Sequence, residues 1–456
     1  MPSVRLVVHP QTKPLSGSVP VPSDKSIGHR ALLIGALTNG TCEIRGFSHG
    51  EDNVSTARAL SEMGVVFEGL DDPSARAVRV RGVGLFGLRA PKNPLDCGNS
   101  GTTMRLFCGL LASQPFESVM IGDASLSKRP MLRVVAPLRE RGAILEGKPH
   151  ATRAGDLTAP LRVGPCDEDK PLRALHHESK VASAQVKSAI LLSGLFAHGE
   201  TVLKEPLVSR DHTERLLSSL GVPIQTLGSI VSLDPSGWSG QMPAFEVDLP
   251  GDPSAAAFLQ VAANLIPGSQ VTIRAVCTNP TRTGLFEIAR DMGAGIEVRP
   301  LGDRSGEPVS DVYAWHEPLR GRTVGGELVP RAIDEIPILC ALAVRASGTT
   351  RIVDAEELRV KESDRIHTMV EVLRAFGVEC EELPDGLEIR GTEAPLRACR
   401  IDSRGDHRIA MTAAILGLLA DGPVQIDDAA CIGTSFPRFV GTMRALGATF
   451  DVSTEE

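Results

Sequence analysis

Two helical patterns alternate along the chain. In the first, an amphipathic segment ends at a glycine and continues into a short run of alternating apolar and polar residues. A glycine after the last turn is the usual left-handed helix cap, and the alternation is typical of a strand. The pattern recurs six times, which predicts six copies of one structural unit. The terminating glycines are Gly64, Gly142, Gly221, Gly293, Gly377 and Gly447.

The second pattern consists of segments built almost entirely from small and apolar residues. A helix that is apolar all round is predicted to be buried on all sides. Each segment is followed by a further strand-like run, so one unit reads as buried helix, strand, amphipathic helix, strand. We therefore predict an α/β fold with helices inside and sheets outside. The six apolar segments are residues 24–40, 98–113, 183–199, 252–268, 334–348 and 405–422.

Two segments rich in proline and glycine interrupt the repeats, at residues 9–25 and 232–254. Such composition is typical of linkers. We expect two lobes, because 456 residues exceed one ordinary core. Residues 22–243 would form the lobe with units one to three. Residues 1–21 would pair with residues 244–456 in the lobe with units four to six.

Composition and charge limit the function. The formal net charge of -8 and the 4% aromatic content argue against a nucleic-acid surface. Nine scattered cysteines without a C-x-x-C pair are typical of reduced thiols and suggest no metal site. The apolar runs are too short to span a membrane. We expect a cytoplasmic monomer that binds neither membrane nor nucleic acid.

Cations lie at the starts of many predicted helices, where the helix dipole is already positive. Repeated cations there are explained if the helix ends bind anions such as phosphate or carboxylate. The alternative is that each cation pairs with a neighbouring acid, as Arg210–Asp211 and Asp364–Arg365 could. Across the repeats, the pattern favours a large anion site between the two lobes. The cations are Lys25, Arg30, Arg105, Arg129, Lys187, Arg210, Arg282, Lys361, Arg365, Arg408 and Arg438.

Several motifs together resemble the enolpyruvyl transferase family over nearly the whole chain. They are "SDKSIGHRALL", "GNSGTTMRL", "GDASLSKRPM", "SAQVKSAILLSGL", "SRDHTERL", "IDEIPIL", "LRVKESDRI" and "DHRIAM". The resemblance implies two lobes, each with three βαβαββ units. It also implies transfer of the enolpyruvyl group of phosphoenolpyruvate to the 5-hydroxyl of shikimate 3-phosphate, by addition and elimination, with release of phosphate. No metal or organic cofactor is implied.

Two other functions remain open at this point. The sister reaction uses UDP-N-acetylglucosamine as acceptor, but those enzymes usually carry a cysteine in a mobile loop, and "GDASLSKRP" has none. The sister enzymes also usually have Asn after the first lysine, whereas Lys25 is followed by Ser26. A non-catalytic repeat protein that binds an anionic partner would need the cations but not Asp334 and Glu362.

The resemblance also implies roles for individual residues. Asp334 would accept the hydroxyl proton, Glu362 would protonate the methylene carbon, and Lys25 would reach both substrates. Glu362 would need a closed, dry site that favours its protonated form. The shikimate 3-phosphate residues would be Lys25, Ser26, Arg30, Ser183, Ala184, Gln185, Arg210, Asp334 and Lys361. The phosphoenolpyruvate residues would be Lys25, Gly101, Arg129, Gln185, Arg365 and Arg408. We expect Asp364 to orient its neighbour Arg365.

Three positions bear on the inhibitor glyphosate. Leu106 and Thr434 stand where many members have Pro and Lys, and with "SAQVKSA" they resemble the second, glyphosate-tolerant class. Gly101, however, stands where tolerant members commonly carry Ala, which would crowd the inhibitor. We expect partial or weak tolerance.

Overall fold

The six apolar segments form helices in which nearly every side chain is buried, as predicted. In five of them an N-cap side chain accepts a hydrogen bond from a backbone N–H of the first turn, which satisfies one otherwise unpaired donor. The helices are α1 (Lys25–Ala36), α3 (Gly101–Leu111), α5 (Ala184–Gly194), α7 (Pro253–Leu265), α10 (Ile336–Val344) and α12 (His407–Gly417).

The amphipathic segments also form helices. Each of the six predicted terminating glycines has a positive φ, between 78° and 107°, a conformation that costs glycine little. These helices are α2 (Glu51–Glu62), α4 (Leu132–Glu140), α6 (His212–Ser219), α8 (Gly284–Asp291), α11 (Arg365–Ala375) and α13 (Phe439–Ala445). Shorter helices are α9 (Leu328–Ala332), η1 (Leu126–Lys128), η2 (Glu356–Val360) and η3 (Ala429–Thr434).

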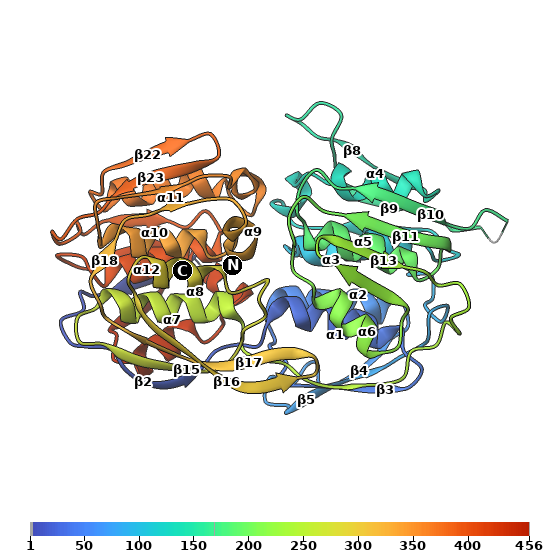
Figure 1. Cartoon of the computed structure of the whole chain (residues 1–456), viewed down its shortest axis with the longest axis horizontal. Coiled ribbons are helices and arrows are strands. Elements are labelled where there is room, and N and C mark those ends of the chain that lie inside the picture. Colours follow the sequence, from blue (N-terminus) through green and yellow to red (C-terminus); the bar gives the residue numbers. More distant parts are fainter. Residues whose placement is uncertain (1–2, 168, 456) are drawn as a thin grey trace. The chain divides into compact units, whose positions relative to one another are not determined.

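This computed structural model describes residues 3–167 and 169–455, which form two units (Figure 1). The described residues contain six four-stranded sheets. Across each sheet, the first strand lies at one edge and is parallel to the second, and the second is antiparallel to the third. A buried helix precedes the second strand of each sheet.

The sheets of the second unit are β14 (Glu246–Asp248), β3 (Thr41–Arg45), β5 (Ala77–Arg81), β4 (Val66–Glu68); β6 (Leu95–Asp96), β7 (Ser118–Ile121), β9 (Leu157–Val163), β8 (Leu145–Pro149); and β10 (Arg173–Glu178), β11 (His198–Lys204), β13 (Ile230–Leu233), β12 (Ile224–Leu227). Those of the first are β2 (Ser16–Pro20), β15 (Gln270–Cys277), β17 (Glu307–Trp315), β16 (Gly295–Arg304); β19 (Thr323–Val324), β21 (Thr349–Ile352), β23 (Gly386–Arg390), β22 (Cys380–Leu383); and β24 (Arg400–Asp402), β25 (Val424–Asp427), β1 (Ser3–Val8), β26 (Phe450–Glu455). A two-stranded pair joins β18 (Leu319–Arg320) and β20 (Ala346–Ser347).

Two strands exchange sheets. Strand β2 precedes α1 in the sequence, but it pairs with β15, which follows α7 (Figure 1). Strand β14 precedes α7, but it pairs with β3, which follows α1. Strand β1 lies between β25 and β26. The beginning of the chain therefore completes sheets built from the last third of the sequence and from the segment after α7.

The boundaries of the units differ from the predicted ones. The first unit contains the chain up to Pro22, Pro250–Asp303 and the chain from Pro308 onward; the second contains Ser23–Leu249 and Arg304–Glu307. The expected crossing at residues 243–244 was too early, because β14 still belongs to the sheet of β3. The tip of the β16–β17 hairpin was not anticipated in the second unit. There Glu307 contacts the His212 ring, with 2.7 Å between Oε1 and Nδ1, and both side chains are buried.

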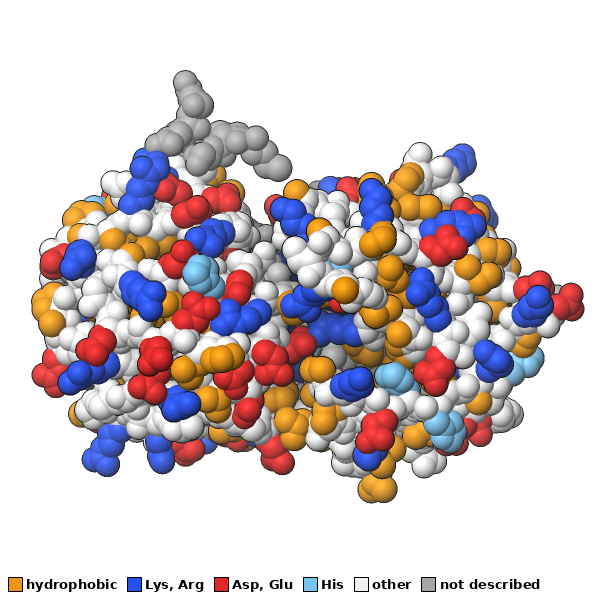
Figure 2. Space-filling view, turned by 90° about the horizontal axis from the view of Figure 1, so that it is seen from above, with side chains coloured by type: hydrophobic (Ala, Val, Ile, Leu, Met, Phe, Trp, Pro, Cys, Tyr) orange, Lys and Arg blue, Asp and Glu red, His pale blue; other side chains and the backbone are white. Residues whose placement is uncertain are grey.

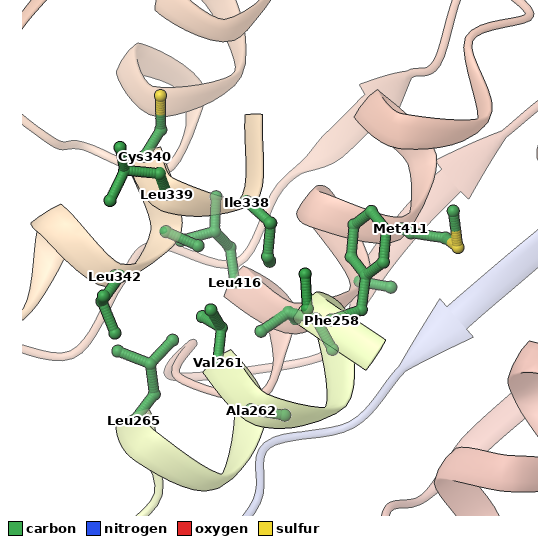
Figure 3. Close-up of a cluster of buried hydrophobic side chains, with 14 of the residues drawn as sticks. Phe258, Val261, Ala262, Leu265, Ile338, Leu339, Cys340, Leu342, Met411 and Leu416 are labelled. Carbon is green, nitrogen blue, oxygen red and sulfur yellow. The ribbon is translucent and has the colours of Figure 1, made fainter. Parts of the chain in front are cut away.

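The core of the first unit lies where α7, α10 and α12 meet (Figure 3). Phe258 and Val261 of α7 face Ile338 of α10 and Leu416 of α12, and all four are 0–1% exposed. Each such side chain contributes about 1.5–3 kcal/mol by its burial. This packing fixes the start of α10 beside the start of α12, where candidate functional residues lie.

In the second unit, α3 and α5 approach each other closely. A Cβ at Gly109 of α3 would lie 2.1 Å from the carbonyl oxygen of Ala189 in α5, so only glycine fits this crossing. The close approach brings the starts of α3 and α5 together. These buried helices contrast with the surface seen in Figure 2, where basic and acidic side chains are interspersed.

Arg141, at the end of α4, is a fully buried arginine that binds only neutral groups. Its guanidinium donates to the carbonyl oxygens of Arg173 and Ile190 and to the hydroxyls of Ser193 and Thr201, at 2.6–3.2 Å. Burial lowers the pKa of this guanidinium to about 10. The side chain thus joins α4, α5, β10 and β11.

Replacing Arg141 should destabilise the second unit. Arg141→Met would leave several buried acceptors without their donor, which should lower the free energy of unfolding by about 2–4 kcal/mol. Urea denaturation followed by circular dichroism measures the change. Arg153→Met removes an exposed arginine and is the control; equal stability of both variants would contradict the structural role of Arg141.

Candidate active site

The start of α1 carries two predicted ligands that are held in different ways. The ammonium of Lys25 lies 2.8 Å from Oδ2 of Asp52, at the start of α2. Arg30 is only 3% exposed and donates to the hydroxyls of Thr213 (2.6 Å) and Ser188 (2.7 Å). Burial lowers the pKa of Arg30 to about 10, although Glu214 and Asp24 oppose this. Arg30 therefore aligns α1 with α5 and α6.

Gly101 lies at the first residue of α3, between two arginines. A Cβ at this position would lie 2.7 Å from Nη1 of Arg105 and 3.0 Å from Nη1 of Arg129. Asn99 holds Arg129 through its Oδ1, at 2.7 Å, while its Nδ2 donates to Asp123 at 2.6 Å. The missing side chain of Gly101 therefore lets two guanidinium groups converge at one helix start.

Gln185, in the first turn of α5, is oriented by α3. Its Oε1 accepts a hydrogen bond from Arg105 (2.8 Å), and its Nε2 donates to Thr102 Oγ1 (2.9 Å). Ser183 is the N-cap of α5, Ala184 is its first residue, and Arg210 lies just before α6. Within the second unit, the contacts thus link the starts of α1, α3 and α5, where the predicted ligands lie.

In the first unit, Arg365 is the centre of a buried ionic cluster. Its side chain is 1% exposed, and its Nε lies 2.8 Å from Oδ2 of Asp406. Its Nη2 lies 2.5 Å from Oε2 of Glu362, and its Nη1 lies 3.4 Å from Oδ1 of Asp334. Lys361 Nζ lies 3.6 Å from the same Asp334 oxygen. Arg365 therefore joins the predicted residues Glu362 and Asp334 to Asp406, and Lys361 joins the cluster through Asp334.

Arg408 completes this cluster from α12. Its Nη1 donates to the backbone oxygen of Asp334 at 2.9 Å, and its Nη2 lies 3.8 Å from Oδ2 of the same residue. Asp406, the N-cap of α12, accepts hydrogen bonds from Ser363 Oγ and from the Arg408 backbone N–H, both at 3.0 Å. Asp334 and Asp406 thus connect the start of α12 with the segments before α10 and α11.

Opposite charges oppose the effect of burial on the pKa values of Lys361, Arg365 and Asp406. Burial lowers the pKa of Lys361, and Asp334 opposes that change. For Arg365 burial is outweighed by Asp406, Glu362 and Asp334, so its pKa is raised. The pKa of Asp406 is lowered despite its burial, chiefly because Arg365 favours the carboxylate. Three cations and three carboxylates therefore occupy one small region of this unit.

One expectation about pairing was wrong. Asp364 does not orient Arg365: its Oδ1 caps α11 at the backbone N–H of His367, and its Oδ2 binds Arg359 at 2.9 Å. Asp211 pairs with Arg215 at 2.9 Å. Other helix-start cations contact carboxylates from distant elements, as for Arg282, which binds Asp252 at 3.0 Å.

Sequence reasoning missed several residues that orient the candidate ligands. Asn99 and Asp406 lie inside quoted motifs and carried a signal, because both immediately precede or cap a buried helix. Asp52 binds Lys25, and Glu205 accepts a hydrogen bond from the backbone N–H of Ser183 at 2.9 Å. Neither carried a signal in the sequence, because each becomes meaningful only through a contact with a distant residue. Among the described residues, no group of three or more histidine, cysteine or acidic side chains is arranged to hold a metal ion. Within that same part of the chain, none of the helices has the length and apolarity to span a membrane.

The fold is the one found in solved enolpyruvyl transferases. A solved structure of the enolpyruvyl transferase NikO from Streptomyces tendae matches the whole chain with a TM-score of 0.76 at 16% identity, which shows the fold. The chain belongs to the EPSP synthase (3-phosphoshikimate 1-carboxyvinyltransferase) family, whose model matches residues 10–443. The predicted mixed α/β fold and family are thereby confirmed.

Individual relatives agree with this family. The 3-phosphoshikimate 1-carboxyvinyltransferase of Geobacter sp. (strain M21) is 46% identical over 94% of this chain and 96% of its own. That of Acidithiobacillus ferrooxidans (strain ATCC 53993 / BNL-5-31) is also 46% identical, over 98% and 99%. The solved EPSP synthase from Acinetobacter baumannii is 40% identical, with a TM-score of 0.84 over 99% of this chain and 100% of that one. The chain is thus a carboxyvinyltransferase enzyme of the shikimate pathway.

Proposed function

We propose that the two charged clusters act on the same pair of substrates, phosphoenolpyruvate and shikimate 3-phosphate. The two units would then serve as the two predicted lobes. The observation that carries this proposal is the cluster around Arg365, where a buried cation touches the candidate acid Glu362 and the candidate base Asp334. Both substrates are anionic, and both acid–base groups of the reaction would lie beside the cations that bind them.

The proposed roles divide between the units. Lys25, Ser26, Arg30, Ser183, Ala184, Gln185 and Arg210, with Asp334 and Lys361, would bind shikimate 3-phosphate. Gly101, Arg129, Gln185, Arg365 and Arg408, with Lys25, would bind phosphoenolpyruvate. Neighbouring side chains orient two of these proposed ligands through hydrogen bonds: Arg105 and Thr102 orient Gln185, and Asn99 orients Arg129.

The reaction follows from these positions. The 5-hydroxyl oxygen attacks C2 of phosphoenolpyruvate while its proton passes to Asp334, and C3 takes a proton from Glu362. This addition forms a tetrahedral intermediate. In the elimination, C3 returns a proton to Glu362 and the C2–O bond to phosphate breaks. Phosphate leaves with the bonding electrons and takes up the proton that Asp334 received, so both carboxyl groups regain their starting states. The cations stabilise the negative charge that accumulates on the leaving phosphate.

Phosphate release from phosphoenolpyruvate, measured with purified protein and shikimate 3-phosphate, tests this function. Glu362→Gln keeps the shape of the side chain but removes its acid, so kcat should fall by about 100-fold or more. Glu379→Gln makes the same change in an exposed ion pair and is the control. Undiminished turnover of Glu362→Gln would remove that residue from the chemistry, and no release by the wild type would refute the function.

Gly101→Ala tests the phosphoenolpyruvate side of the proposal. The added Cβ would displace Arg105 or Arg129, so KM for phosphoenolpyruvate should rise about tenfold through weaker charge-assisted hydrogen bonds. Glyphosate should inhibit the wild type weakly, and the variant still more weakly. Gly441→Ala adds a methyl group where no atom lies within 4 Å, and it should change neither value. Tight competitive inhibition of the wild type would contradict the expected tolerance.

We also propose that the enzyme works as a cytoplasmic monomer with these two small molecules as its partners. Nine free cysteines, five of them buried, fit a reducing compartment. Light scattering after size-exclusion chromatography should give the mass of one chain, 48.4 kDa. A doubled mass at micromolar concentration would contradict the monomer.

A further inference from the structure

A second buried ionic cluster lies in the second unit, and the proposed mechanism does not use it. Lys187, in α5, is 2% exposed, and its ammonium lies 3.0 Å from Oε2 of Glu205 and 2.8 Å from Oε1 of Glu214. It also donates to the backbone oxygen of Ser209 at 3.1 Å. Glu205 follows β11, and Glu214 lies in the first turn of α6. Three buried charges therefore meet between two helices and a strand.

The hydrogen bonds of Glu205 extend beyond this cluster. Its Oε1 accepts from the backbone N–H of Ser183 at 2.9 Å. Its Oε2 accepts from the Ser209 hydroxyl at 2.8 Å and from the Ser209 backbone N–H at 3.4 Å. Ser183 is the N-cap of α5, and Ser209 immediately precedes Arg210. One carboxylate thus fixes two segments that are 26 residues apart in the sequence, each next to a proposed shikimate 3-phosphate ligand.

Stability alone is a poor explanation for such a cluster. Burying charges costs several kcal/mol per ion, and a buried ion pair is often no more stable than well-packed apolar side chains. Burial raises the pKa of Glu214 even though Lys187 opposes the change. For Lys187 the two carboxylates outweigh burial and raise its pKa. The arrangement therefore keeps charges in the interior at an energetic cost.

Charge balance explains why Lys187 accompanies the carboxylates. Glu205 lies beneath the start of α5, where a phosphate is proposed to bind, and an uncompensated carboxylate there would repel it. Lys187 lies one turn after Ser183 on the same helix and neutralises Glu205. Arg30, whose pKa is lowered by burial but partly restored by Glu214, supplies a second positive charge near the other acid. Glu205 can then hold the backbone of the pocket without opposing the anion.

We propose that Glu205, neutralised by Lys187, is a positioning residue for recognition of the 3-phosphate of shikimate 3-phosphate. It fixes the spacing between Ser183 and Arg210 and touches neither substrate. The inference rests on the proposed function, because that function supplies the roles of Ser183 and Arg210. Loss of Glu205 therefore affects one substrate selectively.

Glu205→Gln in the full-length enzyme tests this inference. The variant keeps the size of the side chain but loses the charge that holds Ser183, Ser209 and Lys187. KM for shikimate 3-phosphate should rise about five- to tenfold, and KM for phosphoenolpyruvate should change less than twofold. The dissociation constant of shikimate 3-phosphate, measured by calorimetry, should rise by the same factor. Glu178→Gln breaks the exposed 2.8 Å pair with Lys204 on the neighbouring strands and should leave both KM values unchanged.

A second variant separates positioning from general stability. Lys187→Met leaves Glu205 uncompensated and should also raise KM for shikimate 3-phosphate selectively. Because both side chains act through one contact, the double variant should lose less than the product of the two single losses. Thermal unfolding checks that both variants fold. If either does not, Ser209→Ala replaces it, because this variant removes only one hydrogen bond to Glu205. Ser209→Ala should raise KM for shikimate 3-phosphate with the same selectivity but by a smaller factor.

The outcomes distinguish the inference from the function on which it rests. Equal changes in both KM values, or lower thermal stability with unchanged KM values, would overturn the positioning role. Independent losses in the double variant would also overturn it. If the wild type and Glu178→Gln themselves show no saturable dependence on shikimate 3-phosphate, the proposed function fails instead.

Discussion

Six helices of the described part of the chain are buried along nearly their whole length, and this constraint governs the rest of the structure. The first turn of any helix presents N–H groups without intrahelical partners and a partial positive charge. On the surface, water satisfies these groups; here the helices are buried along nearly their whole length. Cap residues such as Asp24, Ser100 and Asp406 satisfy part of the demand. What remains is a set of positive helix ends suited to anions.

Cationic side chains lie near helix starts, and acidic side chains of the same unit form ion pairs with them. Lys25 has Asp52, Lys187 has Glu205 and Glu214, and Arg365 has Asp406. The partners come from other elements, so the balance is a property of the folded unit. An unbalanced cluster would carry the cost of buried like charges, whereas a balanced one can remain ionised and still exchange a carboxylate for a substrate anion.

The helices and strands could be predicted from the sequence, but the contacts between distant residues could not. Helix type and strand position followed from hydrophobic period, and cap glycines such as Gly64 and Gly377 followed from the requirement for positive φ. The expectation that residues 1–21 pair with the lobe of units four to six already included β2, which pairs with β15. The pairing of β14 with β3 could not be predicted from the residues alone, because such a strand has the same pattern in either sheet.

The expected pairing of Asp364 with its sequence neighbour was wrong for a related reason. Asp364 is next to Arg365 in the sequence, yet Arg365 binds Asp406, 41 residues away. Neighbouring residues at a helix start point in different directions, so adjacency says little about contact. The candidate ligands were found because motifs carried them, whereas Glu205 had no motif and required the hydrogen bonds of Ser183 and Ser209.

The cluster around Arg365 also suggests how binding is coupled to chemistry. Arg365 holds two carboxylates tightly, but they differ in burial: the Asp406 side chain is 0% exposed and that of Glu362 is 18% exposed. Asp406 is further fixed by Ser363 and by capping α12. If Arg365 binds phosphoenolpyruvate as proposed, the anion would displace Glu362 rather than Asp406. A carboxylate that loses its cation and gains an anionic neighbour binds a proton more readily. Arrival of phosphoenolpyruvate at Arg365 would thus itself prepare Glu362 to donate the proton that the addition requires.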